Sequence, residues 1–139
     1  MLVAFATTDL QTVDAHFGTA PSFLLWEVDA VGAALAGEVR FSAADEDGDH
    51  GKLGPRLLAL EGCTLLFAAA VGPSAAAQLA SRGIRAAPAR PGERIDELVP
   101  RLVRLLGGAP PPWLQRALRH GAPQGSPAPE AAPAAGSEP

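Results

Sequence analysis

The sequence is poor in several residue types on which common protein functions depend. It contains one cysteine, Cys63, which excludes an internal disulfide and any metal or iron–sulfur site built from several cysteines of this chain. Aromatic residues make up 5% of the chain and tyrosine is absent, so aliphatic side chains and alanine must fill most of a core. A bound metal would therefore depend on histidine, carboxylates, backbone groups or ligands that the guest itself brings.

Charge and long apolar runs are also limited. The formal net charge is −4, and ten of the eleven basic residues are arginine, with no dense basic stripe. This composition argues against non-specific nucleic-acid binding, which requires the neutralisation of many phosphates. Residues 1–6 carry no basic region and are too short for a signal peptide or a membrane span. We therefore expect a cytoplasmic protein with no nucleic-acid or membrane partner.

Composition divides the chain into three zones. Residues 1–108 alternate apolar runs with glycine and proline, and their length suits one globular domain. Residues 109–120 contain a Pro-Pro-Pro-Trp-Leu connector and a predicted short helix. Residues 121–139 contain only Gly, Ala, Pro, Gln, Ser and Glu, so they offer too little apolar surface to offset their ordering entropy. We expect a disordered, Pro/Ala-rich tail in this last zone.

Apolar periodicity in the first zone predicts alternating strands and helices. Short runs of strand-forming residues predict strands, and apolar residues spaced by three or four predict helices. The predicted strands are Leu2–Ala6, Ser22–Val28, Ala33–Phe41, Thr64–Val71 and Ile84–Ala87. The predicted helices are Lys52–Leu60, Ala75–Ser81 and a last one with the apolar stripe Ile95, Leu98, Val99, Leu102 and Leu106. The second and third strands should form a hairpin. This order predicts an α/β fold with a mixed, mostly parallel sheet of about five strands covered by helices.

Proline and glycine mark the predicted helix ends. Pro73 suits the first turn of its helix, and Gly62 and Gly83 suit the residues just past two helix ends. Pro100 would interrupt the last helix if it lay in the interior. We therefore expect Asp96 to cap this helix, which would leave Pro100 in the opening turn, where its missing N–H matters least.

Two loops are expected to meet at one edge of the sheet. If the strands at 2–6 and 64–71 run parallel, the loop Thr7–Thr19 and the turn Gly72–Ser74 emerge together, at the edge where α/β proteins bind ligands. The loop supplies His16. The turn, comprising Gly72, Pro73 and Ser74, supplies backbone N–H groups at a helix N-terminus, which favour an anion.

The other residues of interest also have purely structural interpretations. Phe17 and Gly18 could scaffold the loop, the first as a packed aromatic and the second as a residue with positive φ. Asp14 could orient the imidazole of His16 or stabilise a turn, and the sequence leaves both open. Cys63 begins its strand at the opposite edge, roughly 20 Å from His16 at about 3.3 Å per residue, and is expected to be a small core residue.

Three further residues are expected to lie outside the site. His50 falls in a stretch rich in Asp, Glu and Gly, and we expect it to be solvated. His120 is expected at an exposed helix end. Trp113, after three prolines, is expected to anchor the connector back onto the core.

The loop around His16 and the strand before it carry a family resemblance. Val3–Asp9, Val13–Ala20 and Ser22-Phe23, followed by Asp49–Leu53, Leu60–Cys63, Ala70–Ala75 and Gly83-Ile84, resemble the dinitrogenase iron–molybdenum cofactor biosynthesis family. The segment Pro110–Leu114 is similar to the NifX-like branch of that family. The resemblance covers about residues 2–119. One departure is that the stretch before Leu53, usually more acidic, carries His50 and Gly51 here.

The resemblance implies a ribonuclease-H-like fold without nuclease activity and with no other enzymatic function. It implies a carrier or reservoir that transiently binds an iron–sulfur precursor of the iron–molybdenum cofactor, with His16 as the metal ligand. The expected contacts of this cargo are His16, Phe17, Gly18, Gly72, Pro73 and Ser74. The implied partners are the cluster donor, the assembly scaffold and apo-dinitrogenase, and we expect the carrier to be a monomer.

Two alternative functions remain. The first is an interaction module that docks to apo-dinitrogenase or to a scaffold without holding a cluster. The second is a metal-dependent phosphoryl-transfer enzyme that uses Asp9 and Asp14. The enzyme is the weaker alternative, because no third acidic residue is expected on an adjacent strand.

Overall fold

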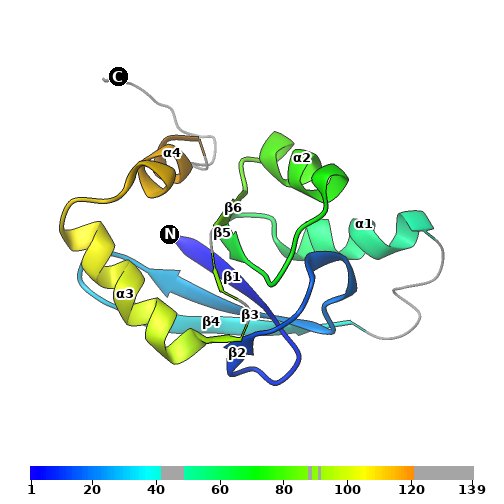
Figure 1. Cartoon of the computed structure of the whole chain (residues 1–139), viewed down its shortest axis with the longest axis horizontal. Coiled ribbons are helices and arrows are strands. Elements are labelled where there is room, and N and C mark those ends of the chain that lie inside the picture. Colours follow the sequence, from blue (N-terminus) through cyan, green and yellow to red (C-terminus); the bar gives the residue numbers. More distant parts are fainter. Residues whose placement is uncertain (42–48, 88, 91, 121–139) are drawn as a thin grey trace.

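Five strands form one mixed sheet whose order determines which loops meet. A computed structural model describes residues 1–41, 49–87, 89–90 and 92–120, without the side chains of 49–53, 119 and 120. The strands are β1 (Leu2–Thr7), β3 (Ser22–Val28), β4 (Ala33–Arg40), β5 (Cys63–Phe67) and β6 (Arg85–Ala87). Their order across the sheet is β4-β3-β1-β5-β6 (Figure 1).

The directions of the strands confirm the predicted sheet. β1 pairs parallel with β5, and β5 pairs parallel with β6. β3 pairs antiparallel with both β1 and β4. Only β3 therefore runs against the other four, and β3 with β4 forms the predicted hairpin.

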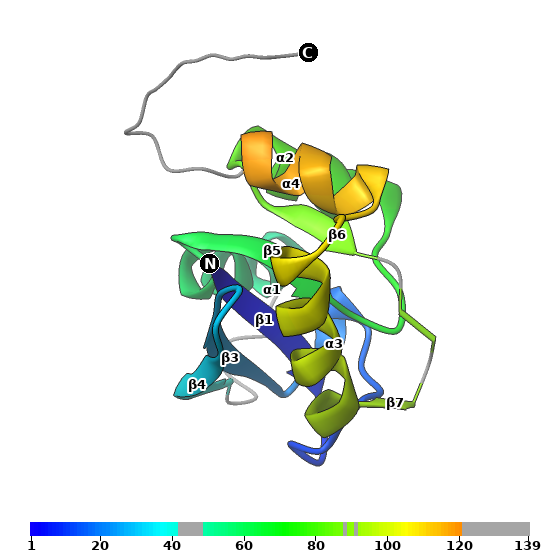
Figure 2. The same ribbon diagram turned by 90° about the vertical axis from the view of Figure 1, so that its left-hand side faces the viewer.

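In the part of the chain that the structure describes, four helices cover the two faces of the sheet. They are α1 (Asp49–Ala59), α2 (Pro73–Ser81), α3 (Ile95–Gly107) and α4 (Pro112–His120). Because alternate residues of a strand face opposite sides, Val3 and Phe5 pack with α3 and α4, whereas Ala4 and Ala6 pack with α1 and α2. Figures 1 and 2 show α1 and α3 on opposite sides of the sheet. The result is a three-layer α/β/α arrangement, and the expected fold class is confirmed.

Two helix starts differ from prediction. α1 begins at Asp49, so the backbone of His50 lies in its first turn rather than in a loop. α3 begins at Ile95 with Arg94 as the N-cap residue, and Asp96 does not cap it. Pro100 is consequently the sixth helical residue, where it removes the hydrogen bond that would reach the Asp96 carbonyl. Pro100 is exposed, so water can reach this part of the helix.

The connector packs back onto the core, as expected. Leu114 and Ala117 of α4 are buried against the cluster that α3 covers, and Trp113 is half-buried against the same cluster. Within the described residues, no helix is long and apolar enough to cross a membrane.

A buried arginine joins α1 to the segment that precedes β3. Arg56 is fully buried and donates from Nε and Nη2 to the Ala20 carbonyl, at 3.2 and 2.6 Å. Its guanidinium also lies 4.5 Å from the centroid of the Phe41 ring, a favourable cation–π contact. Arg56 therefore holds Ala20, the residue that ends the loop carrying His16.

The first prediction concerns this arginine. Arg56→Met should lower the free energy of unfolding by about 1–3 kcal/mol, because the buried Ala20 carbonyl loses its charged donor. Urea unfolding followed by tryptophan fluorescence measures the change. The matched control is Arg82→Met, at an exposed position, which should change stability by less than about 0.5 kcal/mol. Equal effects of the two substitutions would contradict a special role for Arg56.

Candidate functional site

The loop carrying His16 is hydrogen-bonded to the chain that follows β5. The parallel pairing of β1 with β5 continues past both strands as a bridge between His16 and Ala70. The Phe17 N–H donates to the Ala70 carbonyl at 3.0 Å, and the Ala69 N–H donates to the Ala15 carbonyl at 2.9 Å. The two predicted loops therefore lie together at one edge of the sheet.

β5 is shorter than the apolar run that predicts it. The strand ends at Phe67, whose neighbours Phe5 and Ala87 lie close to the ends of their own strands. β6 is assigned only as far as Ala87, and residues 69 and 70 are hydrogen-bonded to the His16 loop instead. The early end of β5 is thus part of how the loop is held.

His16 is exposed and stands at the entrance to a short 3-10 helix, η1 (Phe17–Thr19). Its backbone is extended, with φ −74° and ψ 147°. The imidazole makes no hydrogen bond to any side chain or backbone group in the described part of the chain. Both ring nitrogens can therefore meet a ligand or solvent.

Phe17 and Gly18 support the turn behind His16. Phe17 is completely buried and stacks on Phe23, with 5.7 Å between the ring centroids. The expectation of a positive φ at Gly18 is wrong, since Gly18 lies within η1 and the positive-φ glycines are residues 62, 83 and 92. The 3-10 turn needs no left-handed residue, because its backbone is right-handed helical.

Asp14 stabilises the turn. Its carboxylate accepts a hydrogen bond from the Thr8 N–H at 2.7 Å and another from the Thr8 hydroxyl. No hydrogen bond joins Asp14 to His16 among the interactions described. Of the two roles that the sequence leaves open, the structure supports stabilisation of the loop.

Asp9 is similarly engaged with the loop backbone. It accepts hydrogen bonds from the Gln11 and Thr12 N–H groups, each at 2.9 Å. These bonds lower the pKa of Asp9 to about 2. No group of three or more His, Cys, Asp or Glu residues suited to a metal ion occurs within the described residues. The geometry therefore gives no support to the phosphoryl-transfer alternative.

The turn after β5 opens α2 as predicted. Gly72 is the N-cap residue, Pro73 follows in the first turn, and the Ala76 N–H donates to the Gly72 carbonyl at 2.8 Å. Gly72, Pro73 and Ser74 are exposed. Pro73 has no N–H, and the N–H groups of Ser74 and Ala75 make no backbone hydrogen bond within the described chain. The positive end of α2 is thus open at Gly72, two residues after Ala70, which bridges to His16.

Cys63 lies at the other edge of the sheet. It is 2% exposed and pairs with Leu2, at the start of both strands. Burial, with a smaller contribution from the charge of Glu27, raises the pKa of the Cys63 thiol to about 12. The structure therefore separates Cys63 from His16, as expected, while the side chains of His50 and His120 lie outside the described residues.

Two features went unrecognised in the sequence. Arg56 holds the end of the His16 loop, and a cavity of about 670 Å³ lies between α3 and the sheet, lined in part by Trp26 and Arg94. The alternation of Leu24, Trp26 and Val28 indicates which strand face is apolar, and so offers one signal for the cavity. The sequence offers no comparable signal for Arg56, because its partner lies 36 residues away.

Comparison with known proteins identifies a family for this chain. A family model described as "Dinitrogenase iron-molybdenum cofactor" matches residues 1–105. The chain is 40% identical over 121 residues to Protein NifX of Rhodobacter capsulatus, covering 84% of this chain and 76% of that protein. It is 37% identical over 122 residues to Protein NifX of Herbaspirillum seropedicae, covering 87% of this chain and 84% of that protein.

A second group of relatives is longer. Protein NifY of Klebsiella pneumoniae is 32% identical over 118 residues, which are 85% of this chain and 51% of that protein. The family model includes the segment around His16, and the NifX relatives named above each cover more than four fifths of this chain. The chain therefore belongs to the dinitrogenase iron–molybdenum cofactor family and is NifX-like.

Proposed function

We propose that this protein binds an iron–sulfur precursor of the nitrogenase iron–molybdenum cofactor and carries it between assembly proteins. Family membership supports a role in nitrogenase cofactor biosynthesis. The single observation that carries the finer proposal is an exposed, unbonded histidine held rigidly beside an open helix N-terminus. The cluster is cargo rather than a resident cofactor, and no catalytic step is assigned to the protein.

His16 is the proposed protein ligand to iron. Imidazole is a common ligand to iron and other transition metals. The loop backbone is fixed by the bonds of Phe17 and Ala15 to residues 69–70. The imidazole itself makes no bond within the described chain, so it can meet a cluster without losing an existing partner.

The N-terminus of α2 is the proposed seat for the negative charge of the cluster. Cluster sulfides accept hydrogen bonds, and such bonds are among the features that tune bound clusters. The N–H groups of Ser74 and Ala75 and the helix dipole favour an anion at this position. Phe17 and Gly18 are proposed to shape the loop, with the buried Phe17 ring beneath it.

One protein ligand supported by backbone donors suits a carrier better than a permanent site. Resident iron–sulfur clusters are usually held by several cysteine thiolates, whereas the single cysteine of this chain is buried at the other edge. A cluster held by one imidazole can pass to a partner that offers more ligands. We infer that the donor, the scaffold and apo-dinitrogenase exchange cargo at this exposed edge.

The second prediction tests His16. Anaerobic titration with the isolated iron–sulfur precursor should give saturable visible absorbance with one cluster per chain. His16→Ala should raise the dissociation constant roughly tenfold or more, because the metal loses its protein ligand. His120→Ala is the control, since it removes the same type of side chain at another position.

Two outcomes would contradict the proposal. A protein that stays colourless throughout the titration would remove the carrier function. Equal uptake by the wild type and His16→Ala would remove His16 from the site. If binding to apo-dinitrogenase were retained in the first case, the interaction module would become the preferred function.

The third prediction tests the helix N-terminus. Gly72 has an ordinary φ of −66°, and a Cβ built on it meets nothing within 4 Å, so substitutions there should fold. Gly72→Asp should keep or slightly raise stability, because Asp is a favourable N-cap residue, yet weaken cluster binding several-fold by charge repulsion.

The control for this substitution is Gly72→Asn, which has nearly the same shape and no charge. Asn should weaken cluster binding less than Asp, because both side chains can accept from the Ser74 or Ala75 N–H but only Asp adds a negative charge. Thermal unfolding of both variants checks that the fold persists. Equal affinities of the Asp and Asn variants would show that the cluster does not lie over this helix end.

The fourth prediction concerns Cys63. Raising the pKa from 9.0 to about 12 makes the thiolate about a thousandfold rarer at pH 8 than in the unfolded chain. Iodoacetamide at pH 8 should therefore leave the native protein unmodified but alkylate it fully in urea, as mass spectrometry can record. Cys63→Ser should leave the cluster titration unchanged, and a loss of binding would make Cys63 part of the site.

A further inference from the structure

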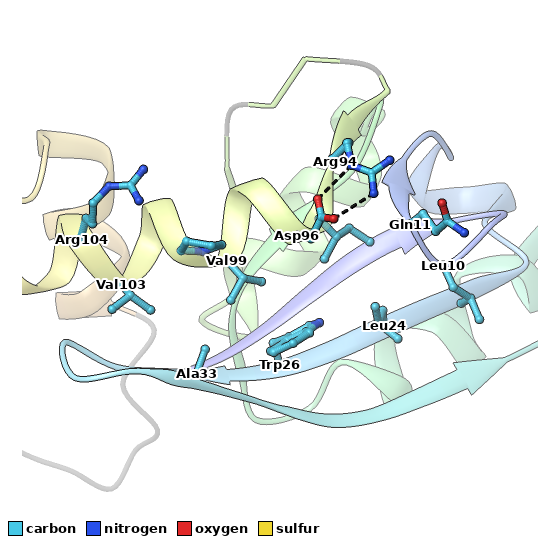
Figure 3. Close-up of a pocket in the computed structure, with 12 residues that line it drawn as sticks. Leu10, Gln11, Leu24, Trp26, Ala33, Arg94, Asp96, Val99, Val103 and Arg104 are labelled. Atoms are coloured by element: carbon cyan, nitrogen blue, oxygen red, sulfur yellow. Dashed lines mark hydrogen bonds and ion pairs between the residues drawn. The ribbon is translucent and has the colours of Figure 1, made fainter.

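A cavity of about 670 Å³ opens between α3 and the hairpin side of the sheet. Its floor is formed by Leu24, Trp26 and Ala33, its roof by Val99 and Val103, and one end by Leu10 (Figure 3). This volume lies within the usual range of small-molecule sites, about 300–1,000 Å³. None of the proposed cluster contacts lines the cavity, so it is a separate site.

The floor of the cavity contains a buried donor without an acceptor. The Trp26 indole nitrogen is shielded from solvent and has no hydrogen-bond partner in the described structure. Figure 3 shows the indole lying beneath Val99, with its nitrogen directed toward the end lined by Leu10 and Leu24. Buried polar groups in folded proteins nearly always have partners. A ligand that carried an acceptor would satisfy this donor once its binding shifted the side chains that cover the nitrogen.

The backbone at the Leu10 end of the cavity is held in place by the protein itself. Leu10 has a φ of +65°, in the left-handed region that leucine rarely adopts. Its N–H donates to the Thr7 hydroxyl at 2.9 Å, and the next residue, Gln11, accepts a bond from the Ile95 N–H at 2.8 Å. These bonds fix Leu10 over the end of the cavity.

The charges at the end of the cavity toward which the Trp26 nitrogen points favour a neutral acceptor, and Arg104 lies toward the opposite end (Figure 3). Arg94 is paired with Asp96 through two hydrogen bonds, of 3.0 and 2.8 Å. Arg94 also interacts with the nearby charges of Glu97 and Asp9. An anionic head beside Trp26 would therefore meet carboxylates as well as Arg94. A neutral acceptor avoids this repulsion.

We propose that the cavity binds a small neutral molecule with a flat apolar body and a carbonyl-type acceptor. The aliphatic side chains of α3 and the Trp26 ring enclose the body, and the Trp26 N–H donates to the acceptor. This inference is independent of cluster binding, because no residue is shared between the two sites.

The experiment uses two probes of matched size, 2-acetylnaphthalene and 2-ethylnaphthalene, which differ in the carbonyl oxygen. Nitrogen-15 NMR of the full chain resolves two indole N–H signals, from Trp26 and Trp113. Addition of 2-acetylnaphthalene should move the Trp26 signal in a saturable manner and leave that of Trp113 in place. The acetyl probe should bind about fivefold more tightly than the ethyl probe, as expected for one buried neutral hydrogen bond.

Two pairs of variants make the test specific. Trp26→Phe keeps an aromatic floor without the N–H, so this variant should bind the two probes with about equal affinity. Trp113→Phe should keep the preference for the acetyl probe. Ala33→Trp, on the exposed first residue of β4, should fill the cavity and abolish binding. Ala34→Trp, next along the same exposed strand, is its control because Ala34 does not line the cavity.

The outcomes that would overturn the proposal are distinct. Equal affinities of the two probes for the wild type would remove the indole as the recognition group. Unchanged binding by Ala33→Trp would place the probes elsewhere. Absence of binding by either probe to the folded wild type, or occupation of this face by a second copy of the chain in solution, would remove the small-molecule site altogether.

Discussion

The parallel pairing of β1 with β5 is the constraint on which the rest of the site depends. It brings the loop after β1 and the turn after β5 to one edge of the sheet, and it continues beyond the strands as the bridge between His16 and Ala70. Two residues later the chain opens α2 at Gly72. His16 and the positive end of α2 therefore adjoin because of sheet topology, although 55 residues separate His16 from Gly72 in sequence.

The loop between β1 and β3 is held from several directions. Asp9 and Asp14 bind backbone groups within it, Arg56 holds its end at Ala20, and Thr12–Val13 forms a short ladder with Glu93–Arg94. Its two halves have different surroundings. Leu10 closes the cavity beneath α3, whereas His16 faces solvent. This division places the two proposed sites on separate halves of one loop.

Much of this arrangement could be predicted from the sequence, because the relevant signals are local. The apolar run at 2–6 and the strand-formers at 22–28 fix two central strands of the sheet. Gly62 and Gly83 have positive φ, as expected of residues just past helix ends. The motif around His16 then indicates the family, and the family suggests a cargo and a role for His16, which apolar periodicity cannot indicate. The proposed role of His16 as a metal ligand rests on that resemblance together with its exposure.

The features that escaped prediction depend on partners far away in sequence or on the fit between layers. Arg56 looks like a surface residue of an amphipathic helix until Ala20 and Phe41 are placed against it. Pro100 lies inside α3 because the N-cap residue is Arg94 rather than Asp96, so the helix begins earlier than predicted. The side chain of Asp96 pairs with Arg94 instead of capping the helix. The cavity under α3 lies where Ala33, a small residue of β4, faces Val99 and Val103. Local pattern indicates which face of a strand is apolar, but only packing decides whether that face is filled, and here Trp26 keeps a donor for which the described chain provides no acceptor.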